Sequence, residues 1–233
     1  MQLEIINSDG EKLKKKIQIK YLKPYETKFI YFLNSKEKNF LNNRKGVVRI
    51  KHKFKNFFSR FLVGNVTNDF DNFGITHSYY DLSKKKDKGQ YWVNPDNKIF
   101  YDSSFSLPFL NNKNFYTELA VYPIFSRTSM SLYYEVYSIF GKKIVNTTKV
   151  LQINEFLKKP VYLNLYDLIK DKINLKNNSN YFFKFIVKSN KILSRLKFGL
   201  NIGNINKKNT FPCNICFNAK LPNKSILNKP STF

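Results

Sequence analysis

Two stretches of the sequence decide the fold class. Residues 44–64 read RKGVVRIKHKFKNFFSRFLVG, and residues 179–199 read SNYFFKFIVKSNKILSRLKFG. Both alternate apolar and polar residues, as where Val48 and Ile50 flank Arg49. A period of two places alternate side chains on opposite faces of a β-strand. β-branched and aromatic residues fill the apolar positions, as a half-buried pleated surface prefers.

The two stretches also resemble each other. They begin at residues 44 and 179, 135 positions apart, and align without a gap. Identical residues coincide at that spacing: Lys53, Ser59, Arg60 and Gly64 fall on Lys188, Ser194, Arg195 and Gly199. Upstream, Glu4 and Gly10 fall on Glu135 and Gly141, 131 positions later, and downstream residues 76–80 face 213–217. We therefore predict two diverged copies of one strand-rich module.

The predicted fold is all-β, with two tandem antiparallel β-sandwich-like modules related by this duplication. Copy one spans residues 1–96 and copy two spans residues 97–233. Strand-like runs within 97–133 have no counterpart ahead of Met1. We therefore expect the first module to lack its opening strands and the chain to be a fragment. Asp9-Gly10 is typical of a hairpin turn, and residues 165–172 permit one short helical turn.

The chain is strongly basic, with 41 Lys and Arg against 16 Asp and Glu and a formal charge of +25. Such a charge favours a polyanion partner, which is nucleic acid, an acidic glycan or an anionic membrane surface. The alternative is codon drift in an AT-rich genome, because Lys, Asn, Ile, Phe and Tyr all use A/T-rich codons. Both interpretations stay open. The lysine runs at 14–16 and 84–86 are either solvated or contact a polyanion without sequence specificity.

The best polar grouping lies in residues 75–83, ITHSYYDLS. On an extended strand His77, Tyr79 and Asp81 share one face, which suits a sugar or a phosphate. His77 and Asp81 would lie about 13 Å apart, too far for a catalytic pair.

Two further pairs are candidate ligand-binding residues. Tyr91 and Trp92 are adjacent aromatics that suit stacking on a sugar ring or a base, or simple burial in the core. Arg60 and Arg195 occupy equivalent places in the two copies. They are interpreted either as anion contacts or as arginines that donate to turn carbonyls.

Other chemistry is sparse. Cys213 and Cys216 form a CxxC pattern, but residues three apart on a strand point to opposite faces, so we interpret them as ordinary thiols. No Gly-rich phosphate loop or HExxH pattern occurs, and we predict neither a cofactor nor a metal. The sequence also lacks the run of about 18 apolar residues that a membrane helix needs.

These features favour a non-catalytic binding or structural β-sandwich protein that contacts an anionic polymer. We expect a cytoplasmic location, because the first residues do not form a signal peptide. One alternative is a carbohydrate- or phosphate-directed enzyme that combines the face of His77, Tyr79 and Asp81 with a carboxylate from Asp102 or Glu118. The other is a structural subunit whose basicity reflects codon drift only.

Overall fold

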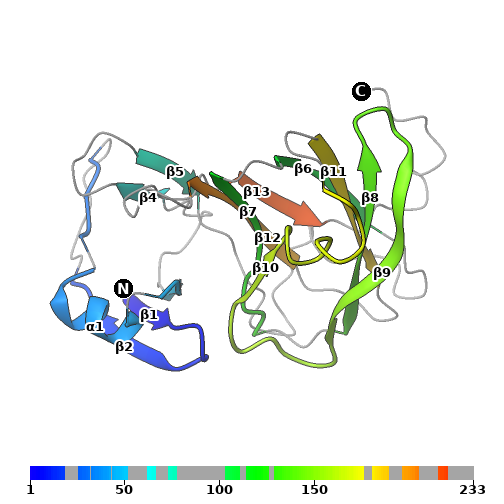
Figure 1. The fold of residues 1–233 in the computed structure, drawn as a ribbon. Coiled ribbons are helices and arrows are strands. Elements are labelled where there is room, and N and C mark those ends of the chain that lie inside the picture. The colour runs from blue at the N-terminus through cyan, green and yellow to red at the C-terminus, as the bar shows by residue number, and fades with distance from the viewer. Residues whose placement is uncertain are drawn as a thin grey trace. The chain divides into compact units, whose positions relative to one another are not determined.

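The protein is mostly β-sheet, as the sequence predicts, with thirteen strands and one short helix among the described residues (Figure 1). The computed structural model describes residues 1–18, 26–31, 33–42, 44–51, 62–66, 73–77, 103–110, 114–125, 129–175, 180–188, 196–204 and 215–219. Within these residues, no helix has the length and apolar character needed to span a membrane.

The chain divides into two compact units. Unit 1 comprises Met1–Ser59 with Lys158–Val161, and unit 2 comprises Arg60–Leu157 with Tyr162–Phe233. The module boundary predicted between residues 96 and 97 lies outside the described residues and stays a prediction.

Unit 1 contains a three-stranded antiparallel sheet in the order β2-β1-β3. Its strands are β1 (Gln2–Ile6), β2 (Lys12–Lys16) and β3 (Val47–Lys51). Leu3 and Ile5 of the central strand are almost fully buried. They share one face with residues opposite them in the register, namely Leu13 and Lys15 of β2 and Val48 and Ile50 of β3.

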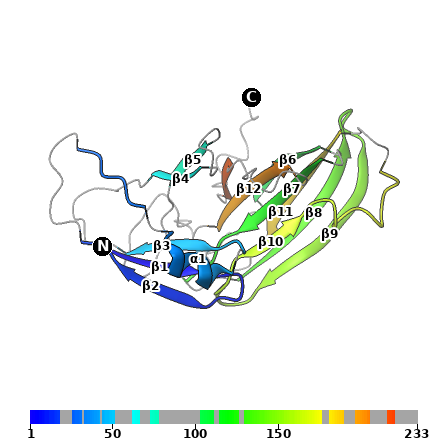
Figure 2. The same ribbon diagram turned by 60° about the vertical axis from the view of Figure 1, so that its left-hand side comes forward.

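Helix α1 (Ser35–Leu41) lies against this sheet and was not predicted (Figure 2). Its first turn is closed by Glu37, whose carboxylate accepts hydrogen bonds from the Asn34 amide at 2.9 Å and from Lys15 Nζ at 2.9 Å. The hydrogen bond from Lys15 lowers the pKa of Glu37. At the other end Asn42 adopts a left-handed φ of 48°, a common way to stop a helix. Lys15 and Glu37 therefore serve the packing of α1.

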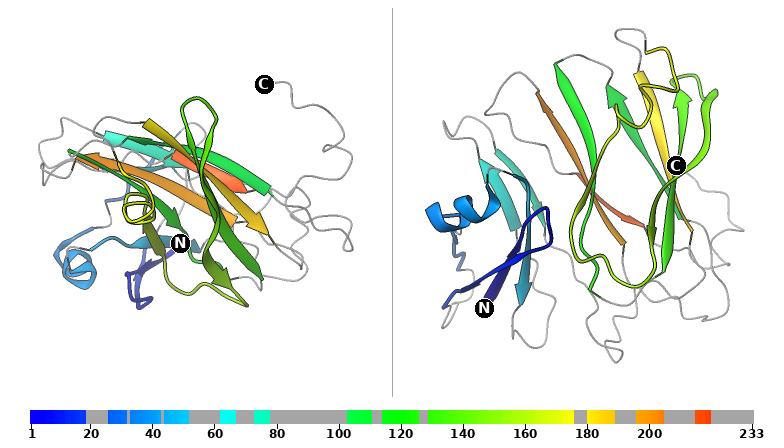
Figure 3. Two further views of the ribbon diagram at one scale, coloured as in Figure 1. Left: turned by 45° about the vertical axis from the view of Figure 1, so that its right-hand side comes forward. Right: turned by 60° about the horizontal axis from the view of Figure 1, so that its bottom comes forward.

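Unit 2 contains a four-stranded antiparallel sheet in the order β6-β11-β8-β9 (Figure 3). Its strands are β6 (Ser103–Leu110), β8 (Met130–Ser138), β9 (Lys143–Ile153) and β11 (Asn180–Lys188). One face is a dense aromatic core in which Phe183 stacks on Phe185, with ring centroids 5.9 Å apart, and meets Phe109 edge-on at 5.7 Å. Leu132, Val136 and Val187 complete this face and are fully buried.

A second four-stranded sheet of unit 2 has the order β10-β7-β12-β13. Its strands are β7 (Phe115–Val121), β10 (Val161–Asn164), β12 (Leu196–Asn204) and β13 (Ile215–Ala219). Leu119, Val121, Phe198 and Leu200 are fully buried on one face. Strand β6 of the first sheet contacts β7 and β13 of the second. A separate hairpin joins β4 (Leu62–Val66) to β5 (Phe73–His77).

The helical turn predicted at residues 165–172 is confirmed. The Lys170 amide donates to the Tyr166 carbonyl at 2.9 Å, and the Ile173 amide donates to the Ile169 carbonyl at 3.1 Å, which is α-helical spacing. Leu165 and Ile169 are fully buried, so the turn adds two side chains to the core.

The hairpins β1–β2 and β8–β9 have turns of the same construction. In residues 7–11 the Gly10 amide donates to the Asn7 carbonyl at 3.1 Å, and the Asn7 side-chain oxygen accepts from the Asp9 and Glu11 amides. In residues 138–142 the Gly141 amide donates to the Ser138 carbonyl at 3.0 Å, and Ser138 Oγ accepts from the Phe140 and Lys142 amides. Gly10 and Gly141 have positive φ angles of 88° and 78°, which glycine adopts without steric cost. The hairpin predicted at Asp9-Gly10 is thus confirmed.

The strands beyond these turns also correspond in register. In unit 1, Glu4 of the central strand lies opposite Arg49 of β3. In unit 2, Glu135 of β8 lies opposite Lys184 of β11. Glu135 follows Glu4 by 131 positions and Lys184 follows Arg49 by 135, which are the two spacings seen in the sequence. Sheet β2-β1-β3 and strands β9-β8-β11 therefore have the same order and direction, and β1 pairs with β3 in the same register as β8 with β11. The β8–β9 pairing differs from β1–β2, because it contains register shifts.

Candidate anion-binding sheet faces

The face of the unit 1 sheet opposite Leu3 and Ile5 carries cations on its two flanking strands, whereas Glu4 and Ile6 on its central strand are buried. Glu4 lies on this face, and side chains alternate between the two faces along a strand. The face therefore also contains the residues paired with Glu4 on β2 and β3 and, on each strand, the residues two positions away. We call it face 1; it consists of Gln2, Glu4 and Ile6 from β1, Lys12, Lys14 and Lys16 from β2, and Val47, Arg49 and Lys51 from β3. Face 1 thus carries five cations and one carboxylate.

Glu4 organises face 1. Lys51 Nζ lies 2.7 Å from one carboxylate oxygen, and an Arg49 guanidinium nitrogen lies 3.4 Å from the other. Only 3% of Glu4 is exposed. This burial alone would raise the pKa of Glu4, but the Lys51 hydrogen bond and the charges of Lys51, Arg49 and Lys12 outweigh it and lower that pKa. Glu4 is therefore ionised at neutral pH and fixes the cations of β3 in place.

The outer face of strands β9-β8-β11 in unit 2 has a similar composition. The register places it around Glu135 of β8, opposite the aromatic core. We call it face 2; it consists of Tyr133, Glu135 and Tyr137 from β8, Lys143, Thr147 and Lys149 from β9, and Phe182, Lys184, Ile186 and Lys188 from β11. Face 2 thus carries four lysines and one carboxylate.

Glu135 accepts hydrogen bonds from three side chains. Lys143 Nζ donates to it at 2.7 Å, Thr147 Oγ1 at 2.6 Å and the Tyr137 hydroxyl at 2.6 Å. These hydrogen bonds, led by that from Lys143, lower the pKa of Glu135 to about 2. Lys184 Nζ lies 4.0 Å away on the neighbouring strand. Glu135 therefore occupies the same place in face 2 as Glu4 occupies in face 1.

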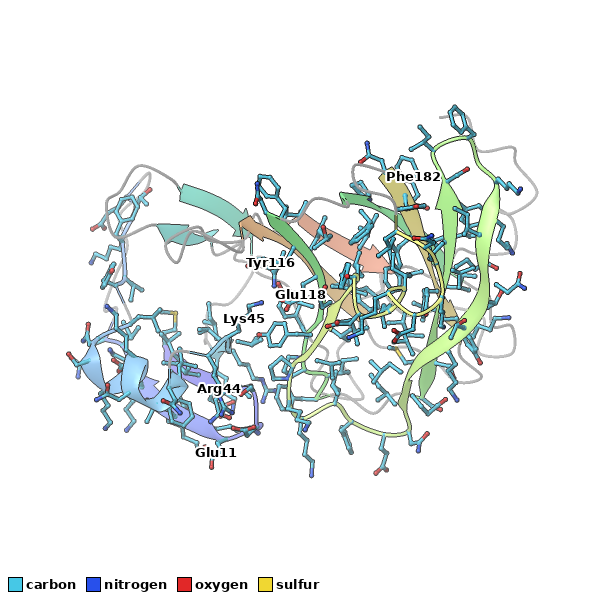
Figure 4. All side chains as sticks on the ribbon, viewed as in Figure 1. Glu11, Arg44, Lys45, Tyr116, Glu118 and Phe182 are labelled. Atoms are coloured by element: carbon cyan, nitrogen blue, oxygen red, sulfur yellow. The ribbon has the colours of Figure 1, made fainter. Side chains whose placement is uncertain are left out.

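Face 2 differs from face 1 in its aromatic side chains. Lys143 lies over the Tyr137 ring at 5.6 Å and Lys188 lies over the Tyr133 ring at 5.7 Å, both within cation–π range. Phe182, near the start of β11, is 42% exposed (Figure 4). Face 2 thus offers flat apolar surfaces next to positive charge.

A third polar cluster lies on the β7-β12 pair. Asn201 Nδ2 donates to the Glu118 carboxylate at 2.7 Å, and Glu118 is only 9% exposed. Tyr116 of β7 lies two residues from Glu118 (Figure 4), and burial raises its pKa, with the Glu118 charge adding to the effect. Glu118, the predicted carboxylate of the enzyme alternative, is thus hydrogen-bonded within its own sheet.

The structure describes only some of the candidate site residues that the sequence analysis identified. His77 is the last residue of β5, opposite Leu62 of β4. The remaining candidate site residues, Tyr79, Asp81, Tyr91, Trp92, Arg60 and Arg195, lie outside the described residues, as do Asp102 and Cys213. Cys216 lies in β13 opposite Gly199. Among the described residues no cluster of His, Cys, Asp and Glu could hold a metal ion.

The lysine run at 14–16 divides between two faces, and Lys51 of β3 joins one of them. Lys14, Lys16 and Lys51 lie together on face 1, whereas Lys15 lies on the opposite face with Glu37. Lys84, Lys85 and Lys86 lie outside the described residues.

Comparison with known proteins adds no assignment. No protein-family profile, no curated protein and no solved structure matches the chain.

Proposed function

We propose that the protein is a non-catalytic binding protein that contacts an anionic polymer through faces 1 and 2. The observation that carries this proposal is the distribution of charge on the strands. The described strands contain eleven cationic residues: Lys12, Lys14, Lys15, Lys16, Arg49, Lys51, Lys143, Lys149, Lys184, Lys188 and Lys197. They contain three acidic residues, Glu4, Glu118 and Glu135, and all three are buried.

Exposed cations and buried acids on the same strands support the interpretation that the positive charge serves binding. Codon drift enriches lysine wherever it is tolerated, but it does not remove exposed acids from strands while leaving them in turns. Acids such as Asp9, Glu11, Asp167 and Asp171 lie outside the strands. The strand faces therefore present positive charge without an exposed acid to cancel it.

The spacing of face 1 suits a repeating anion. Lys12, Lys14 and Lys16 stand about 7 Å apart along β2, because each residue of a strand advances about 3.4 Å. Lys51 and Arg49 lie across the sheet on β3. A flexible polyanion lying over this grid meets several cations at once and releases its counterions, a mechanism that needs no sequence-specific contact.

Face 2 adds a second kind of contact. The rings of Tyr133, Tyr137 and Phe182 lie among lysines, and aromatic rings stack on nucleic-acid bases and on sugar rings. The one carboxylate of face 2, Glu135, is held ionised by three donors, so we assign it a role in positioning the lysines and not in contacting the polymer.

We further propose that faces 1 and 2 descend from one duplicated module. Supporting this are the two matched turns, the shared register of Glu4 with Arg49 and of Glu135 with Lys184, and the constant spacings of 131 and 135 residues. The turn type alone is common among hairpins, so the proposed common origin rests on its combination with the strand order and the position of the buried acid.

Equilibrium binding tests the function. The full chain is titrated into fluorescein-labelled (dT)20 and into labelled heparin at several salt concentrations, with anisotropy as the readout. Lys12→Gln/Lys14→Gln/Lys16→Gln should weaken binding and reduce the salt slope by about 2 for single-stranded DNA, since each contacted phosphate contributes about 0.7.

The matched control is Lys36→Gln/Lys38→Gln/Lys158→Gln, which removes the same charge from exposed positions elsewhere. It should lose much less affinity than the face 1 variant. Equal losses in the two triple variants would show that only net charge matters. Binding of the wild-type chain that does not change with salt would refute the electrostatic mechanism. Comparison of the two polymers shows whether bases or acidic sugars are preferred.

A further inference from the structure

The two turns of the same construction differ in the residues at their tips. Residues 7–11 read NSDGE in unit 1, and residues 138–142 read SIFGK in unit 2. Ile139 and Phe140 thus stand where unit 1 has Ser and Asp, and Lys142 stands where it has Glu. Turn positions of this kind favour Asn, Asp and Ser, whose side chains hydrogen-bond to nearby backbone groups. The turn itself therefore does not account for the apolar residues in unit 2.

The apolar side chains at this tip are exposed to solvent. The exposed fraction is 54% for Ile139 and 89% for Phe140. Ile144, at a register shift of the same hairpin, is a third exposed apolar side chain. All three lie within residues 129–175, which the structure describes without a gap. Single exposed apolar residues are common on proteins, but three near the end of one hairpin form a patch that packing does not explain.

The turn also satisfies most of its own backbone donors. Three consecutive amides, those of residues 140–142, donate to the hydroxyl or the carbonyl of Ser138. The Ser138 amide in turn donates to the Lys142 carbonyl at 2.9 Å. A backbone group that enters an apolar phase without a partner is costly. This turn can therefore leave water at a low cost to its main chain.

The charge around the tip is positive. Residues 136–154 contain Lys142, Lys143 and Lys149 and no Asp or Glu. The acid that precedes them, Glu135, is buried. At a membrane surface, aromatic side chains lie at the level of the headgroups and lysines are attracted to anionic lipids. The tip combines both kinds of side chain within four residues.

We propose that the β8–β9 turn contacts an anionic lipid bilayer, with Ile139 and Phe140 entering the interface and Lys142 at the headgroups. A bilayer fits this tip better than a pocket in a protein partner, because it accepts protruding apolar side chains and flanking lysines without a defined geometry. The inference does not rest on the proposed polymer binding, since neither Phe140 nor Lys142 belongs to face 1 or face 2.

Vesicle flotation tests the proposal with the full chain. The vesicles are phosphatidylcholine alone, or phosphatidylcholine with phosphatidylserine at about a third of the lipid. Phe140→Asn should weaken binding to the anionic vesicles about tenfold or more, because it removes the burial of an aromatic side chain. Lys142→Gln should weaken binding to the anionic vesicles about fivefold and leave the neutral vesicles unaffected.

The matched control is Phe156→Asn. Phe156 is also exposed, but it lies just beyond the end of β9 that is farther from the turn. The same chemical change there should leave vesicle binding as in the wild type. Because Asn suits a turn position, Phe140→Asn should unfold at the same urea concentration as the wild type. It should also bind heparin and (dT)20 unchanged.

A fluorescent reporter tests insertion directly. Phe140→Trp is mixed with anionic vesicles whose acyl chains carry bromine, which quenches tryptophan that enters the bilayer. The wild type, whose one tryptophan is Trp92, supplies the background. The emission added by the new tryptophan should be quenched with brominated lipid and should not be quenched in solution.

Several results would overturn the proposal. They are equal vesicle binding by the wild type and Phe140→Asn, an equal loss in Phe156→Asn, binding that does not depend on phosphatidylserine, or unquenched emission from Phe140→Trp. Absence of vesicle binding while heparin is still bound would overturn the membrane tip and leave the proposed function intact. Vesicle binding without binding of heparin or (dT)20 would have the opposite meaning.

Discussion

Replacement of Glu135 by Gln tests whether the buried acid stabilises face 2 through its charge. A pKa of about 2 in place of 4.5 corresponds to about 3 kcal/mol, at 1.36 kcal/mol per unit. Lys143 and Lys184 are 41% and 40% exposed, so solvent screens part of this energy, and we expect Glu135→Gln to cost about 1–2 kcal/mol at pH 7. Because the folded pKa is lowered, the stabilisation is complete above pH about 5. It is lost as the pH falls toward 2.

The assay is urea unfolding of both proteins at pH 7, 5, 4 and 3, followed by circular dichroism. The difference between wild type and Glu135→Gln should fall by about half or more between pH 5 and pH 3. Asp171→Asn, which removes an exposed acid, is the control and should change stability by less than about 0.5 kcal/mol throughout. A destabilisation by Glu135→Gln that is the same at pH 7 and pH 3 would refute the reasoning, because it would be independent of the carboxylate charge.

Four other substitutions test the packing and the turn geometry of unit 2 by the same unfolding assay. Phe183→Ala should cost about 3–5 kcal/mol because its ring is fully buried, whereas Phe182→Ala on the opposite face should cost less than about 0.5 kcal/mol; equal costs would contradict the assignment of faces. Gly141→Ala should cost about 1 kcal/mol from its positive φ alone, because a Cβ there meets nothing within 4 Å. Gly199→Ala should cost about 1–3 kcal/mol, because its Cβ would fall 2.5 Å from the Tyr122 hydroxyl; a neutral effect would show that the ring is free to move.

The fold class was accessible from the sequence because strand periodicity is a local property. Alternation around Val48 and Phe183 predicted strands, and Asp9-Gly10 predicted the hairpin, since each depends on neighbouring residues only. Helix α1 was missed because it spans only seven residues, although Asn34 and Glu37 have the spacing of a capping box. The contact of Glu37 with Lys15, by contrast, comes from a distant strand and has no local signal.

The candidate site could be predicted only in part, because its contacts also join residues from different strands. The alignment paired Glu4 with Glu135, but nothing in it showed that both acids are buried beneath lysines and arginines from neighbouring strands. Strand register decides which side chains meet, and a shift by one residue exchanges the two faces of a sheet. The lysine run at 14–16 therefore contributed two members to face 1, while Lys15 turned to the other side.

The most direct test of the central claim is a lysine footprint. The full chain is acetylated briefly with and without saturating heparin or (dT)20, and the modified lysines are quantified by mass spectrometry. The account predicts that Lys12, Lys14 and Lys16 are protected severalfold, while Lys36 and Lys38, exposed on helix α1, react as in the free protein. Equal protection of all five, or protection of the helix lysines alone, would contradict a binding face on the strands.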